Sequence, residues 1–214
     1  MLEVTTLDVK IGSTNILREV NLNVPQGTMC GLIGRNGAGK TTFMRSVMGL
    51  IKVQAGNIEF DHINLVKVHS HKRARMGIGY MPEDRRLVPG LTVEENVLLP
   101  AWAIDMDDSA DRLKWIYKVM PEVEQFASRR ANQLSGGQQK LVALARALMC
   151  GSKMLMLDEP FEGVAPALAR RLAEVLSHIK EEGLSILLSE SNEKHLEDLL
   201  DTVFVIERGA ITPR

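Results

Sequence analysis

The residues best suited to chemistry begin at Gly34, where the sequence reads GRNGAGKT. This stretch follows an apolar run at 29–33 and precedes residues with helical spacing at 41–50, as a phosphate-binding loop requires. Its glycines let successive main-chain N–H groups turn toward phosphate oxygens, and the start of a helix adds partial positive charge. We expect Lys40 to reach the β- and γ-phosphates of a nucleotide and the Thr41 hydroxyl to bind Mg²⁺.

The predicted nucleotide-binding residues form one continuous segment of this loop and the helix start. They are Gly34, Arg35, Asn36, Gly37, Ala38, Gly39, Lys40, Thr41 and Thr42.

Two carboxylates follow a second apolar run, which reads MLMLDEP at 154–160. A buried strand ending here would direct Asp158 toward the loop, where it would hold the Mg²⁺ shell directly or through water. Glu159 would then polarise the attacking water as a general base. A strand that ends in solvated acids is the plain alternative, and it loses weight beside a complete phosphate-binding loop.

A third segment, LSGGQQK at 134–140, has two interpretations. Ser135 as N-cap with Gln138 three residues later forms a capping box, so the segment can simply start a helix. However, Gly136 and Gly137 in a first helical turn each cost roughly 1 kcal/mol relative to alanine. A helix start that exposes bare N–H groups is also an anion site.

The three motifs, in this order, resemble the ATP-binding cassette (ABC) ATPases over almost the whole chain, and LSGGQ is the signature of that family. The resemblance implies ATP hydrolysis with ATP and Mg²⁺ as cofactors, and head-to-tail pairing with a second ABC ATPase subunit, identical or paralogous. Ser135, Gly136, Gly137 and Gln138 of one chain would close over the γ-phosphate held by the Lys40 loop of the other. The resemblance also implies transmembrane permease subunits as partners, at the cytoplasmic face of the inner or plasma membrane.

Two further segments resemble one subgroup, the ATPases of importers for branched-chain amino acids and similar small carboxylates. These segments are MPEDRR at 81–86 and DEPFEGVAP at 158–166. The subgroup implies an indirect partner, a solute-binding protein. Glu83 stands where the wider family has glutamine, and we expect it to join Thr41 and Asp158 at Mg²⁺. Ala165 stands where most cassettes carry an aspartate.

Two positions depart from the family pattern. Ile11 replaces the aromatic residue that normally stacks on adenine, so we predict weak discrimination between adenine and guanine nucleotides. Ser191 lies three residues after the apolar run that ends at Leu188. By the resemblance it is at the switch position, where cassettes usually have histidine and this subgroup often has glutamine. Serine is too short to reach the γ-phosphate except through a bridging water. We therefore expect slow hydrolysis with Glu159 as the principal base.

The elements that must position these residues alternate between strands and helices, which predicts an α/β fold with a mostly parallel sheet. Alternating apolar positions at 2–10 and 16–24 predict an N-terminal antiparallel β subdomain. Helical patterns at 91–102 and 112–119 predict an inserted helical subdomain. By the resemblance, residues 1–214 form one ABC ATPase domain, with the P-loop core at 1–84 and 150–214. The helical subdomain, including the signature helix, would occupy 85–149.

Composition argues against several classes of function. The formal net charge of −1 gives no indication of nucleic-acid binding. No apolar run approaches the roughly 18–20 residues that span a bilayer, and no leader for secretion is expected. Cys30 and Cys150 lie in apolar stretches, which favours buried thiols in a reducing compartment. His69 and His71 beside basic residues 72–75 favour a solvated helix face over a metal site.

Other functions within this family remain open at this point. A lipid or lipopolysaccharide exporter's ATPase is one, although the PEDRR segment argues against it. A soluble cassette of translation or DNA repair would carry a second cassette or a long coiled-coil insertion, and neither is present. A weakly hydrolysing structural or regulatory cassette, paired with an active partner, is favoured by Ile11 and Ser191. The intact Lys40, Asp158 and Glu159 weigh against it.

Overall fold

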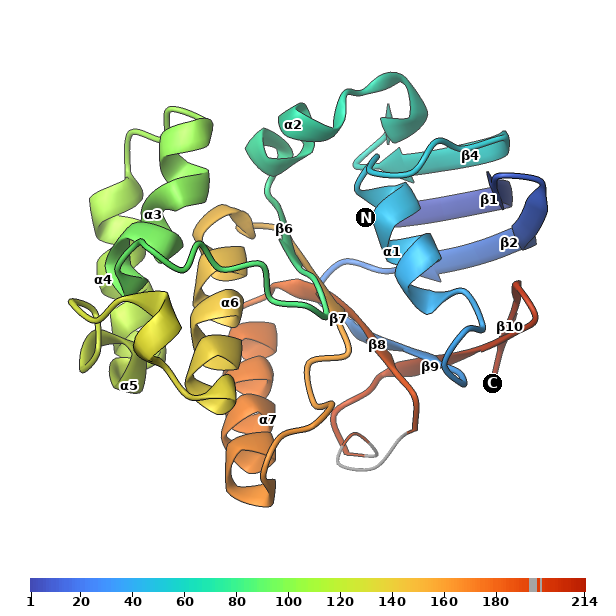
Figure 1. Ribbon diagram of the computed structural model, residues 1–214. Coiled ribbons are helices and arrows are strands. Elements are labelled where there is room, and N and C mark those ends of the chain that lie inside the picture. Colours follow the sequence, from blue (N-terminus) through green and yellow to red (C-terminus); the bar gives the residue numbers. More distant parts are fainter. Residues whose placement is uncertain (193–195, 197) are drawn as a thin grey trace.

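Two β-sheets and a layer of helices make up the computed structural model, which describes residues 1–192, 196 and 198–214 (Figure 1). The central six-stranded sheet has the order β10-β9-β3-β8-β7-β6. Its strands are β3 (Met29–Ile33), β6 (Ile78–Met81), β7 (Met154–Asp158), β8 (Ser185–Glu190), β9 (Thr202–Glu207) and β10 (Ala210–Pro213). All neighbours are parallel except β10, which pairs antiparallel with β9. The predicted mostly parallel α/β fold is confirmed.

Strand β8 lies between β3 and β7, which makes the three strands that end in the predicted motifs direct neighbours. The carboxyl ends of parallel strands meet at one edge of a sheet, where α/β proteins bind their ligands. The strand order therefore gathers the phosphate-binding loop, the two acids and Ser191 at a single edge.

The central sheet is buried on both faces, which accounts for the continuous apolar runs of its strands. Met154 and Met156 of β7 face the core shared with α1 (Lys40–Val47) and the second sheet. Leu155 and Leu157 face the opposite core, which the helical layer shares. This two-residue alternation follows from the pleat of a strand.

The second sheet is antiparallel, with the order β2-β1-β4-β5. Its strands are β1 (Leu2–Ile11), β2 (Thr14–Val24), β4 (Ala55–Phe60) and β5 (Ile63–Asn64). The two strands predicted from alternation are confirmed. Phe43, Met44 and Val47 of α1 share a buried core with this sheet and with the central sheet. The helix after the phosphate-binding loop is thus held by both sheets.

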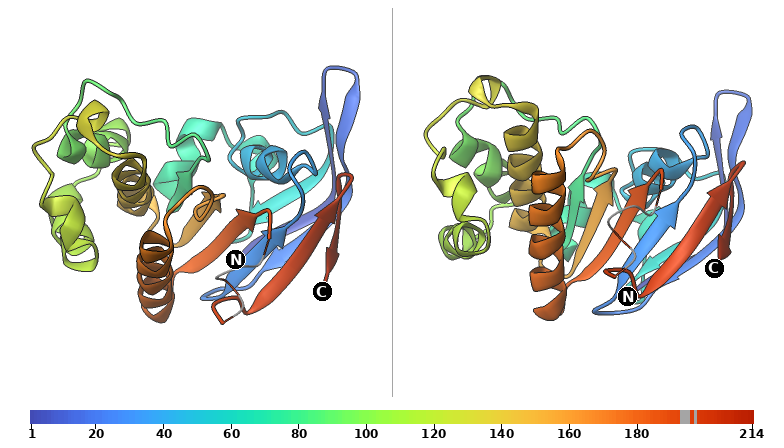
Figure 2. Two further views of the ribbon diagram at one scale, coloured as in Figure 1. Left: turned by 60° about the horizontal axis from the view of Figure 1, so that its bottom comes forward. Right: turned by 90° about the horizontal axis from the view of Figure 1, so that it is seen from below.

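The helices form a layer on the other face of the central sheet (Figures 1 and 2). Helices α6 (Gly136–Cys150) and α7 (Pro166–Glu181) lie nearest the sheet, and the predicted helical insert lies beyond them as α3 (Val93–Ala103), α4 (Ser109–Val119) and α5 (Pro121–Glu124). Helix α6 contacts both α3 and β6. The division into 85–149 and the remainder stays a prediction, since α6 belongs to the buried core of both parts. Within the described residues, no helix combines the length and apolar character of a membrane span.

The predicted solvated helix face is confirmed for His69, His71 and Lys72, which are exposed. It is wrong for Arg73, in α2 (Ser70–Arg73), which is only 4% exposed. Its guanidinium donates hydrogen bonds to the main-chain carbonyls of Val47, Leu65 and Val68. Since Val47 ends α1, this cation lies at a helix C-terminus, where positive charge is stabilising. Arg73 therefore fixes the far end of the helix that starts at Lys40.

Candidate functional site

The phosphate-binding loop and the acid of β7 are joined by a buried ion pair. Lys40 Nζ lies 3.0 Å from Glu159 Oε1, and both side chains are almost fully buried. The Lys40 ammonium also donates to the carbonyl oxygens of Gly34 and Arg35. It thus lies within the loop, where an ionised phosphate would be a stronger acceptor than either carbonyl.

The loop conformation depends on glycine at two positions. Gly39, immediately before α1, has φ = 116°, which L side chains rarely adopt. Gly34 approaches β9 so closely that a Cβ atom would lie 2.4 Å from the carbonyl oxygen of Ile206. The loop can therefore take this path only with glycine at these positions.

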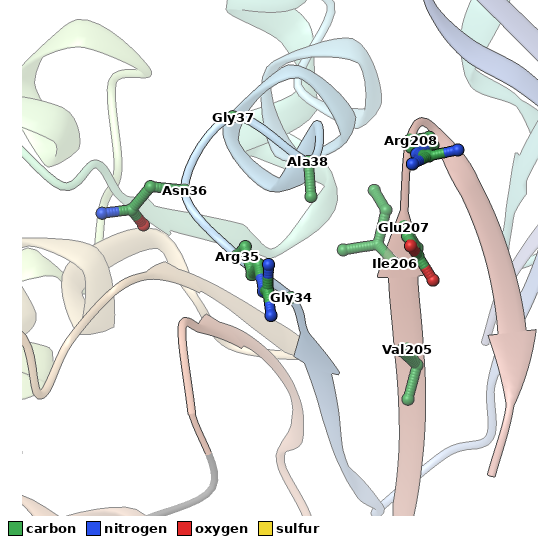
Figure 3. Close-up of a pocket in the computed structure, with 9 residues that line it drawn as sticks. All are labelled: Gly34, Arg35, Asn36, Gly37, Ala38, Val205, Ile206, Glu207 and Arg208. Atoms are coloured by element: carbon green, nitrogen blue, oxygen red, sulfur yellow. The ribbon is translucent and has the colours of Figure 1, made fainter.

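Two hollows flank the loop. The first, about 490 Å³, lies between the loop and β9, and Figure 3 shows Asn36 pointing away from it. The second, about 420 Å³, is lined by Ile16, Asn36, Gly37, Gly39, Lys40, Thr41, Thr42, Glu83 and Glu159. The second hollow contains the ammonium, hydroxyl and carboxylate groups that a magnesium-bound triphosphate requires. Its chemistry makes it the candidate nucleotide site.

Asp158 is fully buried at the end of β7. Its Oδ1 accepts a hydrogen bond of 2.6 Å from the Ser189 hydroxyl, and its Oδ2 lies 3.5 Å from the Tyr80 hydroxyl. Burial raises the pKa of Asp158, while hydrogen bonds from Ser189 and Thr41 oppose that shift. The Thr41 hydroxyl and the Asp158 carboxylate are hard oxygen donors, which suit Mg²⁺.

A magnesium ion at this place would take its other ligands from the nucleotide and water. The described part of the chain holds no group of three or more His, Cys, Asp or Glu side chains arranged for a metal. Mg²⁺ usually binds with one or two protein carboxylates, substrate phosphates and several waters. The residues present therefore fit this ion, and their roles as ligands stay predictions.

Glu159 is held in a strained conformation. Its φ of 50° lies in the left-handed region, which is unusual for a residue other than glycine and is frequent at functional sites. Its N–H is 3.1 Å from the Ser189 carbonyl oxygen and 3.3 Å from Ser189 Oγ. The surrounding strands thus determine where this carboxylate lies.

The structure places Ser191 directly between the loop and Glu159. Its Oγ lies 2.7 Å from Asn36 Oδ1 and 3.1 Å from each Glu159 carboxylate oxygen. The single hydroxyl proton can be donated to only one of these acceptors at a time. Ser191 thus contacts the predicted base without an intervening group, while its role toward the γ-phosphate stays a prediction.

Glu83 and Ile11 differ in how they relate to the candidate site. Glu83 lines the same hollow as Lys40, and its pKa is raised by burial and by the nearby carboxylates of Glu162, Asp158 and Glu159. Ile11 is 50% exposed at the end of β1, whereas Ile16 of β2 lines the hollow. Sequence reasoning missed Ile16, because its apolar position in β2 looks the same as a core position. The adenine contact of Ile11 and the metal contact of Glu83 stay predictions.

The signature segment forms the predicted capping box at the start of α6. Ser135 Oγ accepts from the N–H of Gln138 at 3.3 Å, and Gln138 Oε1 accepts from the N–H of Ser135 at 3.0 Å. Gly136 and Gly137 line a different hollow from the one around Lys40. Within one chain, therefore, the signature and the phosphate-binding loop line different hollows, which meet at Glu83.

Four functional candidates escaped sequence reasoning: Ser189, Tyr80, Lys140 and Glu190. Ser189 is the register partner of Asp158 across β7 and β8. Glu190 accepts a hydrogen bond of 2.7 Å from the N–H of Phe161. Lys140, within the quoted LSGGQQK, donates to the main-chain oxygens of Glu159 and Glu162. The signal for Lys140 was its basic side chain on the buried face of an amphipathic helix.

Comparisons with known proteins agree with this arrangement. The profile of the ABC transporter family matches residues 17–162. The chain is 33% identical over 211 residues to the high-affinity branched-chain amino acid transport ATP-binding protein BraG of Pseudomonas aeruginosa, covering 99% of this chain and 91% of BraG. It is 32% identical over 196 residues to the lipopolysaccharide export system ATP-binding protein LptB of Escherichia coli, covering 91% of this chain and 81% of LptB.

A solved dimeric bacterial ABC transporter cassette superposes with a TM-score of 0.86 at 25% identity, covering 99% of this chain and 96% of that one. The family profile spans the phosphate-binding loop, the signature and both acids. The chain therefore belongs to the ABC transporter family, as one of its ATP-hydrolysing subunits.

Proposed function

We propose that this chain powers an importer of branched-chain amino acids or similar small carboxylates. The ATPase function is supported above all by one observation, the buried Lys40–Glu159 pair at the edge where β3, β8 and β7 end. The substrate class is supported by the similarity to BraG along nearly the whole chain. The MPEDRR and DEPFEGVAP segments favour the same subgroup.

In the proposed mechanism, Lys40 and the loop N–H groups hold the β- and γ-phosphates of ATP. Thr41 and Asp158 would hold Mg²⁺, with Glu83 beside them, and an ion bound there would supply positive charge next to the phosphate oxygens. Glu159 accepts a proton from the attacking water, whose oxygen bonds to the γ-phosphorus as the bond to the β-phosphate oxygen breaks. Ser191 orients the Glu159 carboxylate through its hydrogen bond.

The proposed active form is a head-to-tail dimer of two cassettes, identical or paralogous. Each signature segment, Ser135 to Gln138, would contact the γ-phosphate bound to the partner's loop. This arrangement is supported by the different hollows that the signature and the loop line within one chain, and by the similarity to a dimeric cassette. Permease subunits would bind the dimer at the cytoplasmic face of the membrane, and a solute-binding protein would act through them.

An exporter's ATPase is the second candidate, which the similarity to LptB favours. Copurification distinguishes the two candidates. The tagged chain is extracted from membranes, the permease that copurifies with it is identified, and the complex is then reconstituted in vesicles. If the complex is an importer, the vesicles take up labelled leucine when ATP is present on the side of the membrane where the cassette lies. Glu159→Gln abolishes that uptake. A complex with an export permease and no uptake of amino acids would overturn the proposed substrate class.

ATP turnover of the purified chain separates both candidates from a structural cassette. We expect slow but measurable turnover that Glu159→Gln abolishes. Turnover equally low in the natural chain and in Glu159→Gln would instead identify a nucleotide-binding subunit that depends on an active partner.

A further inference from the structure

A buried lysine connects the signature helix to the acid turn of the same chain. Lys140 of α6 is only 5% exposed. Its ammonium lies 2.9 Å from the main-chain oxygen of Glu159 and also donates to the main-chain oxygen of Glu162. Burial lowers the pKa of Lys140, while nearby Glu190 and Glu162 oppose that shift. A buried ammonium bonded in this way fixes the backbone of the turn rather than a side chain.

The same turn is held from its other side by two buried residues of β8. Ser189 accepts from the N–H of Glu159 at 3.1 Å, and Glu190 accepts from the N–H of Phe161 at 2.7 Å. Glu159 sits at φ = 50° within this set of contacts. Because a strained residue persists only where its surroundings over-determine it, the position of the Glu159 carboxylate depends on all three neighbours.

Lys140 also lies close to the signature along the helix. Gly137 and Lys140 are three positions apart, which is about 4.5 Å along the axis of an α-helix. Ser135 caps the same helix, so a displacement of the signature moves Lys140 with it. Lys140 and Gly137 line one hollow, together with Glu83 and Glu162. The signature and the turn that carries the base are thus mechanically joined.

We propose that Lys140 is a positioning residue that couples the two ATP sites of the dimer. This inference rests on the proposed head-to-tail function, in which a signature reads the partner's nucleotide while Glu159 acts on its own chain's nucleotide. Contact between a signature and the partner's γ-phosphate shifts α6, and Lys140 transmits the shift to the backbone of Glu159. ATP at one site thereby aligns the base at the other.

The first test compares Lys140→Met with Lys114→Met. Methionine keeps most of the length of the buried side chain but removes the ammonium group that donates to the main-chain oxygens of Glu159 and Glu162. Lys114, exposed on α4 and paired with Asp111, provides the matched control. For Lys140→Met we expect kcat to fall about 10- to 100-fold, as a small misplacement of a catalytic group produces. KM for ATP stays within about twofold, since the phosphate-binding loop is untouched, and the Hill coefficient falls toward one.

The second test uses mixed dimers purified with two tags. One chain carries Glu159→Gln and its partner carries Lys140→Met, so the only working base belongs to the chain that lacks the lysine. The reference dimer carries both substitutions on one chain and leaves its partner unchanged, so the working base keeps the lysine of its own chain. Coupling predicts turnover about tenfold lower in the first dimer than in the reference, because only there is the lysine missing from the chain that carries the working base. Equal turnover of the two dimers would overturn the coupling.

Further measurements keep the outcomes distinct. Urea unfolding of each variant shows whether it folds. If Lys140→Met does not fold, Lys140→Gln takes its place, because its shorter side chain still donates hydrogen bonds. The inference alone fails if the natural chain dimerises and hydrolyses ATP and the Lys140 variant matches its kcat and Hill coefficient. Both the proposed function and the inference fail if the natural chain does not hydrolyse ATP and does not dimerise in the presence of ATP.

Discussion

At the scale of single residues, the site consists of buried charges that each have a defined partner. Asp158 accepts from Ser189, Glu159 pairs with Lys40, and Glu190 accepts from the N–H of Phe161. Burying a charge is costly unless it is paired or hydrogen-bonded. These partners offset that cost and at the same time restrict where each carboxylate can lie.

The switch position provides a residue-scale prediction. Replacing Ser191 with histidine adds a donor long enough to reach the γ-phosphate, and kcat is expected to rise by about tenfold or more, as a donor aimed at developing charge can produce. Steady-state hydrolysis of ATP measures kcat and KM for the Ser191→His variant beside Ser191→Ala. Unchanged turnover in Ser191→His, with turnover abolished in Glu159→Gln, would show that this position is dispensable.

Glu190 supplies a pH-dependent prediction. Burial raises its pKa to about 7 from the ordinary 4.5, with the Phe161 N–H opposing and Glu159 adding to the shift. Between these values the folded chain keeps a proton that the unfolded chain releases, so rising pH lowers the free energy of unfolding. Glu190→Gln keeps the acceptor for Phe161 and removes the titration.

The difference in unfolding free energy, variant minus natural chain, should therefore grow between pH 5 and pH 8 by about 1 kcal/mol or more. Urea unfolding at four pH values across this range measures it, and the other carboxylates cancel in the difference. A difference that does not change with pH would contradict the raised pKa.

At the scale of elements, two helices start with the same device but serve different purposes. Thr92 and Glu95 form a capping box at the start of α3, as Ser135 and Gln138 do at the start of α6. In both, a side-chain oxygen accepts from an N–H group of the first turn. The cap is therefore a structural need of each helix, and only the glycines after Ser135 distinguish the signature.

The two caps offer a matched pair of variants. Thr92→Ala and Ser135→Ala should each lower the free energy of unfolding by about 1 kcal/mol, since each removes a cap. Only Ser135→Ala should also lower ATP turnover, because only the start of α6 contacts nucleotide in the proposed dimer. Urea unfolding and ATP hydrolysis of both variants check this, and equal losses of turnover would argue that the Ser135 hydroxyl has no role beyond capping.

At the scale of the whole molecule, the central sheet divides the chain into two buried cores. One holds α1 and the antiparallel sheet, and the other holds α6, α7 and the helical insert. The phosphate-binding loop belongs to the first core and the signature helix to the second. In the proposed dimer, the phosphate-binding loop of one chain would therefore meet the signature helix of its partner.

Dimer formation gives a prediction at this scale. Glu159→Gln with ATP and Mg²⁺ should sediment as a dimer, because nucleotide is bound but not hydrolysed. Adding Ser135→Asp should return it to a monomer: aspartate caps a helix as well as serine does, while its charge repels the partner's γ-phosphate. Sedimentation velocity with and without ATP measures both, and a dimer that persists in the double variant would contradict the proposed role of the signature.

The sequence by itself determined the parts whose signals are local. The order of residues along a few turns suffices for the GRNGAGKT loop, the capping box of Ser135 and the apolar runs that become β3, β7 and β8. Glycine spacing, cap chemistry and strand periodicity each act over neighbouring residues, and these predictions were confirmed in the fold. The same local order carried the resemblance to the ABC transporter family.

Only the tertiary structure decided which distant residues meet. Ser189 reaches Asp158 because β8 lies beside β7 in that register, and Lys140 reaches the Glu159 carbonyl because α6 packs against the turn. Arg73, predicted to be solvated, is buried because it meets the end of α1. These contacts join residues 19 to 31 positions apart in the chain. No local pattern encodes them, since they depend on strand order and helix packing.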